Sequence, residues 1–173
     1  MTVFTKDYQI ETKQSQVTFI DITKQVKEAI LESKVTNGIC LVSTSHTTCS
    51  VFLEEYTHDL GEGDTELLLL DLDESLQKIV PNHESAETYR YPGEEHYRVV
   101  ESWPDAEEWL PGGDRSQLWN GDAHIKSTII GASESFNVRD GNLSVGRTGY
   151  IYFVDFDRTR ERTRKFTVTL VGE

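Results

Sequence analysis

The chain has 173 residues, a formal net charge of −13 and a hydrophobic share of 36%. This length favours one domain with a real core, and no stretch approaches the roughly 18 consecutive apolar residues of a membrane helix. The acidity argues against binding to nucleic acid or to an anionic membrane, because both need a cationic face. The N-terminal "MTVFTKDYQI" resembles a strand and not a signal peptide, so we expect a cytoplasmic protein.

The first half of the chain predicts strands around one amphipathic helix. Asp21 can cap a helix over about residues 22–33, with Ile22, Val26 and Ile30 on one stripe. The expected strands of this half are Val3–Ile10, Gln16–Ile20, Ile39–Ser43 and Cys49–Leu53.

A second helix is expected over the segment "TELLLLDLDESLQKIV". Asp64 is placed to cap it, and Pro81 follows its end.

The regular pattern then dissolves between residues 82 and 122. This segment holds three of the four prolines together with Trp103, Trp109 and Trp119. A structureless connection of about forty residues is unusual in a compact domain. We therefore expect a Trp-rich insertion that packs, either with short elements of its own or as a lid over a site.

The C-terminal third predicts an antiparallel sheet. "AHIKSTII" indicates a short helix closed by Gly131, and Asp140-Gly141 is a hairpin signal. The expected strands are Ser133–Val138, Leu143–Val145, Tyr150–Phe156 and Phe166–Val171. About eight strands and three helices in all favour a single α+β domain with a sizeable antiparallel sheet or sandwich.

Three of the five histidines lie where a site would be sensible. His46 ends an apolar strand within "STSHTTCSV", His124 opens the short helix, and His96 lies in the long polar connection. Three imidazoles plus an open position are typical of a catalytic zinc site. Spacing alone does not bring them together, so surface or hydrogen-bonded histidines are the alternative.

The segment "DFDRTRERTRK" places arginines at alternate positions near the C-terminus. If the segment is extended, its arginines share one face. The guanidinium fork suits bidentate contact with a phosphate or carboxylate. The alternative is pairing with the abundant acidic residues, inside one subunit or across an oligomer interface.

Three segments in register are similar to one known family. "HTTCSVFLEE" resembles a His-Thr-Thr/Ser strand that runs on to an Asn-Glu pair. "AHIKSTIIGASESFNVRDGNLSVG" resembles an Ala-His-Leu/Ile-Lys segment that leads to a hairpin. "DFDRTRERTRKFTVTLVGE" resembles a terminal Asp-Gly-Pro-Arg-x-Arg turn and last strand. The family is the YjbQ-like proteins, some described as secondary thiamine-phosphate synthases, and the resemblance spans nearly the whole chain outside the middle connection.

The resemblance implies a YjbQ-like α+β fold, a homotrimer and a divalent metal held on histidines, with zinc as first choice. His46 and His124 match the two clearest site histidines of the family. The third usually follows a Val-Pro and lies close to a Tyr. His96 is our choice for it, and His83 is the rival.

Further roles follow from the same resemblance. Glu55 or Asp64 would be the general base or would orient a ligating histidine. Residues expected to bind an anionic group are Arg160 and Arg162, which match the Arg-x-Arg, and the hydroxyls of Thr47 and Thr48.

The implied activity joins a pyrimidine diphosphate to a thiazole phosphate and releases pyrophosphate, with the metal as Lewis acid. Two alternatives stay open: a metal-dependent hydrolase of a small phosphate ester or amide, and a non-enzymatic metal-binding trimer. The chain departs from the family where Glu54 replaces an Asn and where no Trp-Gln follows Gly146. These departures leave room for a different substrate.

Overall fold

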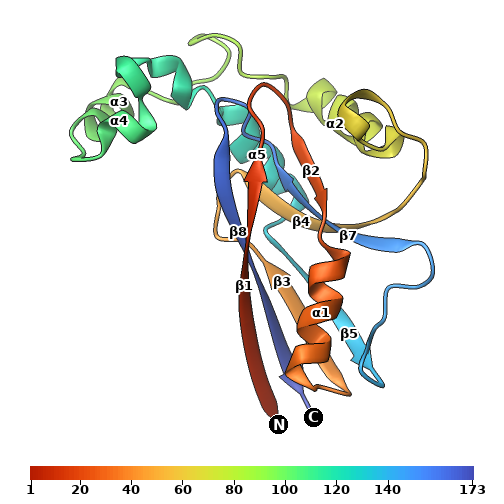
Figure 1. The fold of residues 1–173 in the computed structure, drawn as a ribbon. Helices are drawn as coiled ribbons and strands as arrows, with labels where there is room; N and C mark the ends of the chain where they lie inside the picture. The colour runs from red at the N-terminus through yellow and green to blue at the C-terminus, as the bar shows by residue number, and fades with distance from the viewer.

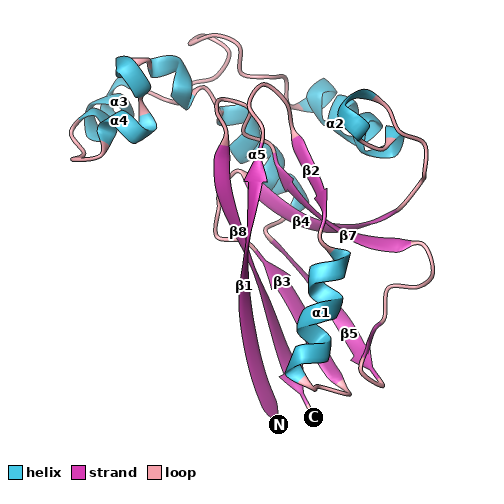
Figure 2. Cartoon of the chain, in the orientation of Figure 1, coloured by secondary structure: helices cyan, strands magenta, loops and turns pink.

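The computed structural model describes residues 1–173, which form an α+β fold with two antiparallel sheets (Figures 1 and 2). The larger sheet has the order β1 (Thr2–Thr12), β8 (Arg162–Gly172), β3 (Gly38–Ser43), β5 (Ser133–Arg139), β6 (Asn142–Leu143). The smaller sheet has the order β2 (Thr18–Asp21), β7 (Gly149–Asp155), β4 (Cys49–Glu55).

Five α-helices and three short 3₁₀ turns complete the chain. The helices are α1 (Thr23–Ser33), α2 (Leu67–Ile79), α3 (Glu94–Glu101), α4 (Ala106–Trp109) and α5 (Gly121–Ile130). The 3₁₀ turns are η1 (Glu62–Asp64), η2 (Pro111–Gly113) and η3 (Arg115–Leu118). Figure 1 shows α3 and α4 well to one side of the sheets and α2 on the other.

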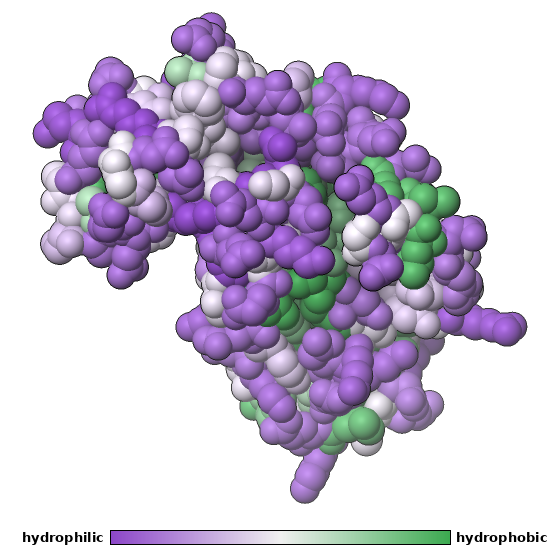
Figure 3. All heavy atoms as spheres, turned by 45° about the horizontal axis from the view of Figure 1, so that its top comes forward, coloured by the Kyte–Doolittle hydropathy of each residue, from purple (hydrophilic) through white to green (hydrophobic).

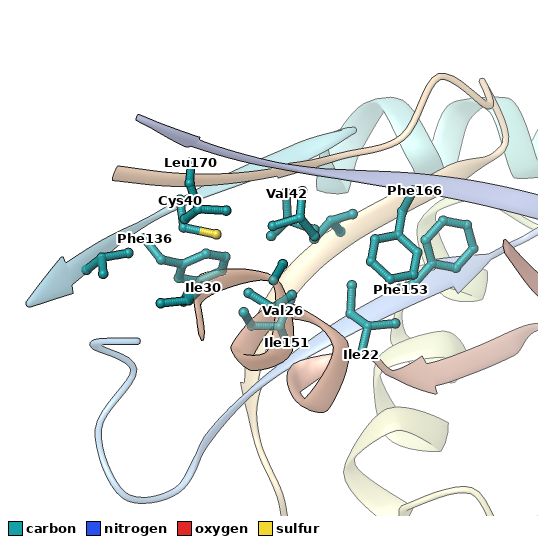
Figure 4. Close-up of a cluster of buried hydrophobic side chains, with 14 of the residues drawn as sticks. Ile22, Val26, Ile30, Cys40, Val42, Phe136, Ile151, Phe153, Phe166 and Leu170 are labelled. Atoms are coloured by element: carbon teal, nitrogen blue, oxygen red, sulfur yellow. The ribbon is translucent and has the colours of Figure 1, made fainter. Parts of the chain in front are cut away.

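The main core lies between α1 and the sheets (Figure 4). Ile22, Val26 and Ile30 are buried at helical spacing, as the predicted stripe requires. On β8, Phe166 and Val168 are fully buried, because alternate side chains of a strand point to the same face. The apolar stripe of α1 and the apolar face of β8 therefore belong to the same core.

The expected capping residues had different outcomes. Asp21 Oδ1 accepts a hydrogen bond from the Thr23 N–H at 2.8 Å and so binds the first helical N–H of α1, although Ile22 occupies the N-cap position. The expectation for Asp64 was wrong. Asp64 lies in η1 with a φ of 60°, and α2 begins only at Leu67, after Glu66 in the N-cap position.

The segment from 82 to 122 folds as short helices with a small apolar cluster of its own. Tyr97, Val100, Leu110 and Leu118 are buried together in this cluster. Its arrangement matters for the site, because the segment carries His96 toward α5.

The surface in Figure 3 is mainly hydrophilic, with apolar atoms visible near its centre and on its right side. None of the helices combines the length and the apolar character that crossing a membrane would require.

Candidate active site

Helix α5 holds His124 against the smaller sheet. The Ser127 hydroxyl donates to the Cys49 carbonyl at 2.7 Å, and the Ser50 hydroxyl donates to the Ser127 carbonyl at 3.2 Å. These two buried hydrogen bonds tie the middle of α5 to the start of β4. The partly buried His124 is consequently carried on a fixed element.

Tyr91 lies between His124 and His96. Its ring centroid is 5.5 Å from that of His124 and 5.2 Å from that of His96. Its hydroxyl is 3.4 Å from His96 Nε2. All three side chains line a cavity of about 660 Å³, together with Arg90. Two of the predicted histidines therefore share one cavity, although they are 28 positions apart in the sequence.

A buried ion pair lies close to this cavity, at the turn between β7 and β8. Asp157 is 2% exposed and pairs with Arg162. It also accepts hydrogen bonds from Asn120 Nδ2 at 2.8 Å and from the Thr159 hydroxyl at 2.7 Å. Burial alone would raise the pKa of Asp157, but Arg162 and these donors lower it below the usual value. Asp157 is thus a fixed anion.

The surroundings set the protonation states of His124 and Tyr91. Burial lowers the pKa of His124, while Asp157 and the Thr47 backbone oppose that shift. Burial, followed by the charge of Asp157, raises the pKa of Tyr91. At neutral pH the cavity thus presents a neutral imidazole beside a protonated phenol.

His83, the rival ligand, lies at the first turn of α5. Its Nδ1 accepts a hydrogen bond from the Gly121 N–H at 3.1 Å, and its ring stacks on Trp119 with centroids 5.9 Å apart. A Cβ on Gly121 would be 3.4 Å from the rings of His83, Tyr89 and Tyr91, so a larger side chain would push them apart. His83 thus caps the helix that carries His124.

His46 does not reach this cavity. The backbone N–H of Lys165 donates to His46 Nε2 at 3.0 Å. Burial lowers the pKa of His46, and the nearby Arg164 adds to that shift. His46 is therefore a hydrogen-bonded histidine beside β8. A hydrogen-bonded histidine was the alternative to a metal ligand that the sequence left open.

The predicted threonines contribute unequally. The backbone of Thr47 contacts the His124 imidazole and favours its protonated form. The Thr48 hydroxyl is buried, donating to Asp155 Oδ1 at 3.2 Å and accepting from Arg164 Nη2 at 3.1 Å. The Thr48 hydroxyl is thus engaged in a network within the protein.

Three other predicted residues lie away from His124. Glu55 is at the far end of β4 from Cys49, roughly 20 Å along the strand at about 3.3 Å per residue. Asp64 lines a different cavity. Arg160 donates from Nη1 to the Trp109 carbonyl at 2.5 Å and lies over that indole ring. Neither Arg160 nor Arg162 lines the cavity, although the charge of Arg162 acts on His124.

The three predicted metal ligands do not form one set within a single chain. His96 and His124 face the same cavity, but His46 is bound to Lys165. No group of three or more His, Cys, Asp or Glu side chains in the structure is placed to hold a metal ion. A three-histidine zinc centre therefore does not fit the side chains of one chain as they stand.

Sequence reasoning missed Tyr91 and Asp157. Asp157 alternates with Asp155 in the segment "DFDRTR", and this signal was available beside the arginines. Tyr91 precedes Pro92 in a region without a regular pattern. Nothing local indicates that its ring would lie between two histidines.

The pKa of His124 is directly measurable by NMR titration of the imidazole signals. We expect a value below the usual histidine value of about 6.5. The Asp157→Asn variant should lower the value further, because Asp157 favours the charged imidazolium. Asp105→Asn, an exposed carboxylate on the insertion, is the matched control and should leave it unchanged.

The same shift predicts a pH dependence of stability. The native state binds this proton more weakly than the unfolded chain does. The free energy of unfolding should therefore fall as the pH drops below about 6.5. A His124 pKa above the usual value would contradict the assigned surroundings.

Comparisons with known proteins agree on the family. The family model of UPF0047 YjbQ-like proteins matches residues 6–173. A UPF0047 protein of Archaeoglobus fulgidus is 32% identical over 147 residues, covering 85% of this chain and 87% of that protein. YugU of Bacillus subtilis, also a UPF0047 protein, is 29% identical over 158 residues, covering 91% and 93% respectively.

Solved structures show the same fold. An uncharacterised YjbQ/UPF0047 protein of Clostridium acetobutylicum has a TM-score of 0.64 at 28% identity and covers 95% of this chain and 99% of its own. A protein of unknown function from Sulfolobus solfataricus has a TM-score of 0.67 at 23% identity and covers 99% of both chains. The chain thus belongs to the YjbQ-like UPF0047 family.

Proposed function

We propose that this protein is an enzyme that acts on a small phosphorylated substrate in the cavity between Tyr91, His96 and His124. The observation that carries the proposal is the placement of two histidines on either side of a protonated tyrosine, next to the buried Asp157–Arg162 pair. Titratable groups with perturbed pKa values in a cavity are typical of catalytic sites.

His124 has the properties of a general base. Its neutral imidazole can accept the proton of an attacking hydroxyl or amine, and Asp157 stabilises the imidazolium that results. Tyr91 keeps its proton and can donate a hydrogen bond to an oxygen on which negative charge develops. His96, within reach of the Tyr91 hydroxyl, orients that donor.

The cationic group for a phosphate is Arg90. Its side chain is exposed and lines the cavity, and no carboxylate forms an ion pair with it. Arg162, by contrast, is largely satisfied by Asp157. Arg90 thus takes the anion-binding role that the sequence assigned to Arg160 and Arg162.

The specific reaction we propose is thiamine-phosphate-synthase-like transfer, in which a thiazole phosphate attacks a pyrimidine diphosphate and pyrophosphate leaves. The resemblance motivates this choice, and an anion-binding cavity with a hydrogen-bond donor for the leaving pyrophosphate is compatible with it. The attacking thiazole nitrogen carries no proton, so in this transfer His124 positions the substrate, and it acts as a base only in the hydrolytic alternative. Hydrolysis of a small phosphate ester would use the same residues, with water as nucleophile. No step is assigned to a metal, because the predicted ligands do not assemble in one chain.

The homotrimer is also part of the proposal. Val3, Val171 and Ile39 are adjacent across β1, β8 and β3, and they are 65%, 40% and 54% exposed. An apolar row on the outer face of a sheet supports burial against another chain.

Activity is tested by mixing the two phosphorylated precursors with purified protein and measuring pyrophosphate release. His124→Ala should lower kcat/KM by about 10²-fold, because the substrate loses a group that positions it beside the Tyr91 donor. His58→Asn is the control, because His58 is exposed and its φ of 64° suits asparagine. Full activity in His124→Ala would contradict the assignment.

A parallel assay with p-nitrophenyl phosphate, with and without a chelator, separates the alternatives. The proposed transfer predicts no turnover of this ester. Turnover that a chelator abolishes would instead favour the metal-dependent hydrolase.

Light scattering on the eluting protein tests the trimer. Wild type should have the mass of three chains, and the double variant Ile39→Asp/Val171→Asp should have the mass of one. Leu31→Asp, an exposed apolar residue of α1, is the matched control and should stay trimeric. A monomeric wild type, or a trimeric double variant, would rule out this interface.

A further inference from the structure

A second cavity, of about 370 Å³, lies between the β1–β2 turn, the β7–β8 turn and the first turn of α5. Its volume is within the usual range for small-molecule sites. Every residue that lines it, except Trp119, is polar or charged. It shares no lining residue with the His124 cavity, so it is a separate feature of the surface.

His83 is the lining residue that points to a ligand. Only 5% of it is exposed, and its Nδ1 accepts a hydrogen bond from the Gly121 N–H at 3.1 Å. Burial lowers the pKa of His83, so the ring is neutral at neutral pH. A neutral imidazole that accepts at one nitrogen carries its proton on the other. His83 Nε2 is therefore an N–H donor.

This donor has no partner in the protein. His83 Nε2 is one of the few buried side-chain atoms that make no hydrogen bond. The charge of Asp122 and the backbone of Ser85 favour the protonated ring, but no atom is placed to accept a hydrogen bond from Nε2. Leaving a buried donor without an acceptor is costly. An acceptor atom bound in the cavity would remove that cost.

Arg158 is the only cation that lines the cavity. Its side chain is 26% exposed, and its Nη2 donates to Asp122 Oδ2 at 3.3 Å. Most of the five N–H donors of the guanidinium therefore stay available. The Asp122 carboxylate also lies 3.8 Å from the buried Lys126, which Asp73 contacts in turn, so Asp122 is not an unpaired charge.

The available donors favour a carboxylate ligand. Its two oxygens lie in one plane and match the guanidinium fork of Arg158, and one of them can accept from His83 Nε2. The N-terminus of α5 adds the positive end of a helix dipole. Because only one guanidinium lines the cavity and Asp122 lies beside it, a singly charged carboxylate fits better than a doubly charged phosphate.

From these observations, we propose that the cavity beside His83 binds the carboxylate group of a small organic acid. Arg158 supplies the counter-charge, and the Nε2–H of His83 supplies the second donor. This site is independent of the function proposed for the His124 cavity, and its test needs no activity measurement.

Titration of the full chain with benzoate, followed by the NMR signals of the histidine side chains, tests the proposal at low ionic strength. Benzoate should shift the signal of the His83 Nε2 proton. It should bind at least tenfold more tightly than benzamide, which has the same shape without the charge. Arg158→Gln should weaken benzoate binding at least tenfold, and the exposed Arg147→Gln is the matched control that should bind as wild type does.

A second variant keeps the test decisive if Arg158→Gln fails to fold. Gln117 is a half-buried lining residue whose side chain bonds only to the exposed Asp114, so Gln117→Glu adds a negative charge at the cavity wall without disturbing the core. It should weaken benzoate binding several-fold.

Several outcomes would overturn the proposal. They are equal binding of benzoate and benzamide, no binding of either, tighter binding of inorganic phosphate than of benzoate, and wild-type affinity in Gln117→Glu. Benzoate that shifts the signals of His124 and not those of His83 would lie in the other cavity, and that result would overturn the proposal as well.

Discussion

The buried carboxylates Asp155 and Asp157 are the charges on which the candidate site depends. Both are almost fully enclosed at the turn where the chain passes from β7 of the smaller sheet to β8 of the larger one. Arg164 pairs with the first and Arg162 with the second. Removing one partner of a buried pair typically costs about 3–5 kcal/mol, so these arginines are held to the turn. Arg162 and Arg164, two of the alternating arginines considered for anion binding, therefore pair with carboxylates at the turn that joins the two sheets.

The insertion completes the site from the other side. Its small apolar cluster gives it a structure of its own, and Tyr91 and His96 come from its N-terminal part. Arg160 links the turn to the insertion through the carbonyl and ring of Trp109. The turn between β7 and β8 thus supports the cavity in two ways. Asp157 favours the protonated form of His124, and Arg160 holds the insertion, which carries Tyr91 and His96.

The sequence predicts those parts of the fold that depend on local period. The stripe Ile22, Val26, Ile30 and the alternation Phe166, Val168 correspond to buried faces, because each period matches its element. A role for Asp21 at the start of α1 was predictable, but Asp64 does not cap α2. There the buried Glu66, bound to Tyr152 from a distant strand, precedes the helix. Tertiary contacts of this kind leave no local signal.

The site was predictable only in part, for the same reason. His96 and His124 could be chosen by residue type, and they share a cavity. The partner of His46 is the backbone of Lys165, and no side-chain pattern reports a backbone donor. Tyr91 enters the site because the insertion folds back onto α5.

Tyr91, His96 and His124 are proposed to form one anion-binding site with Arg90. The most direct test of this site is a crystal structure of the full chain grown with inorganic pyrophosphate. We expect the anion in the cavity, in contact with Arg90 and with the Tyr91 hydroxyl, while Asp157 and Arg162 stay paired. A structure in which His96 lies apart from His124, or in which pyrophosphate binds elsewhere and leaves this cavity empty, would contradict it.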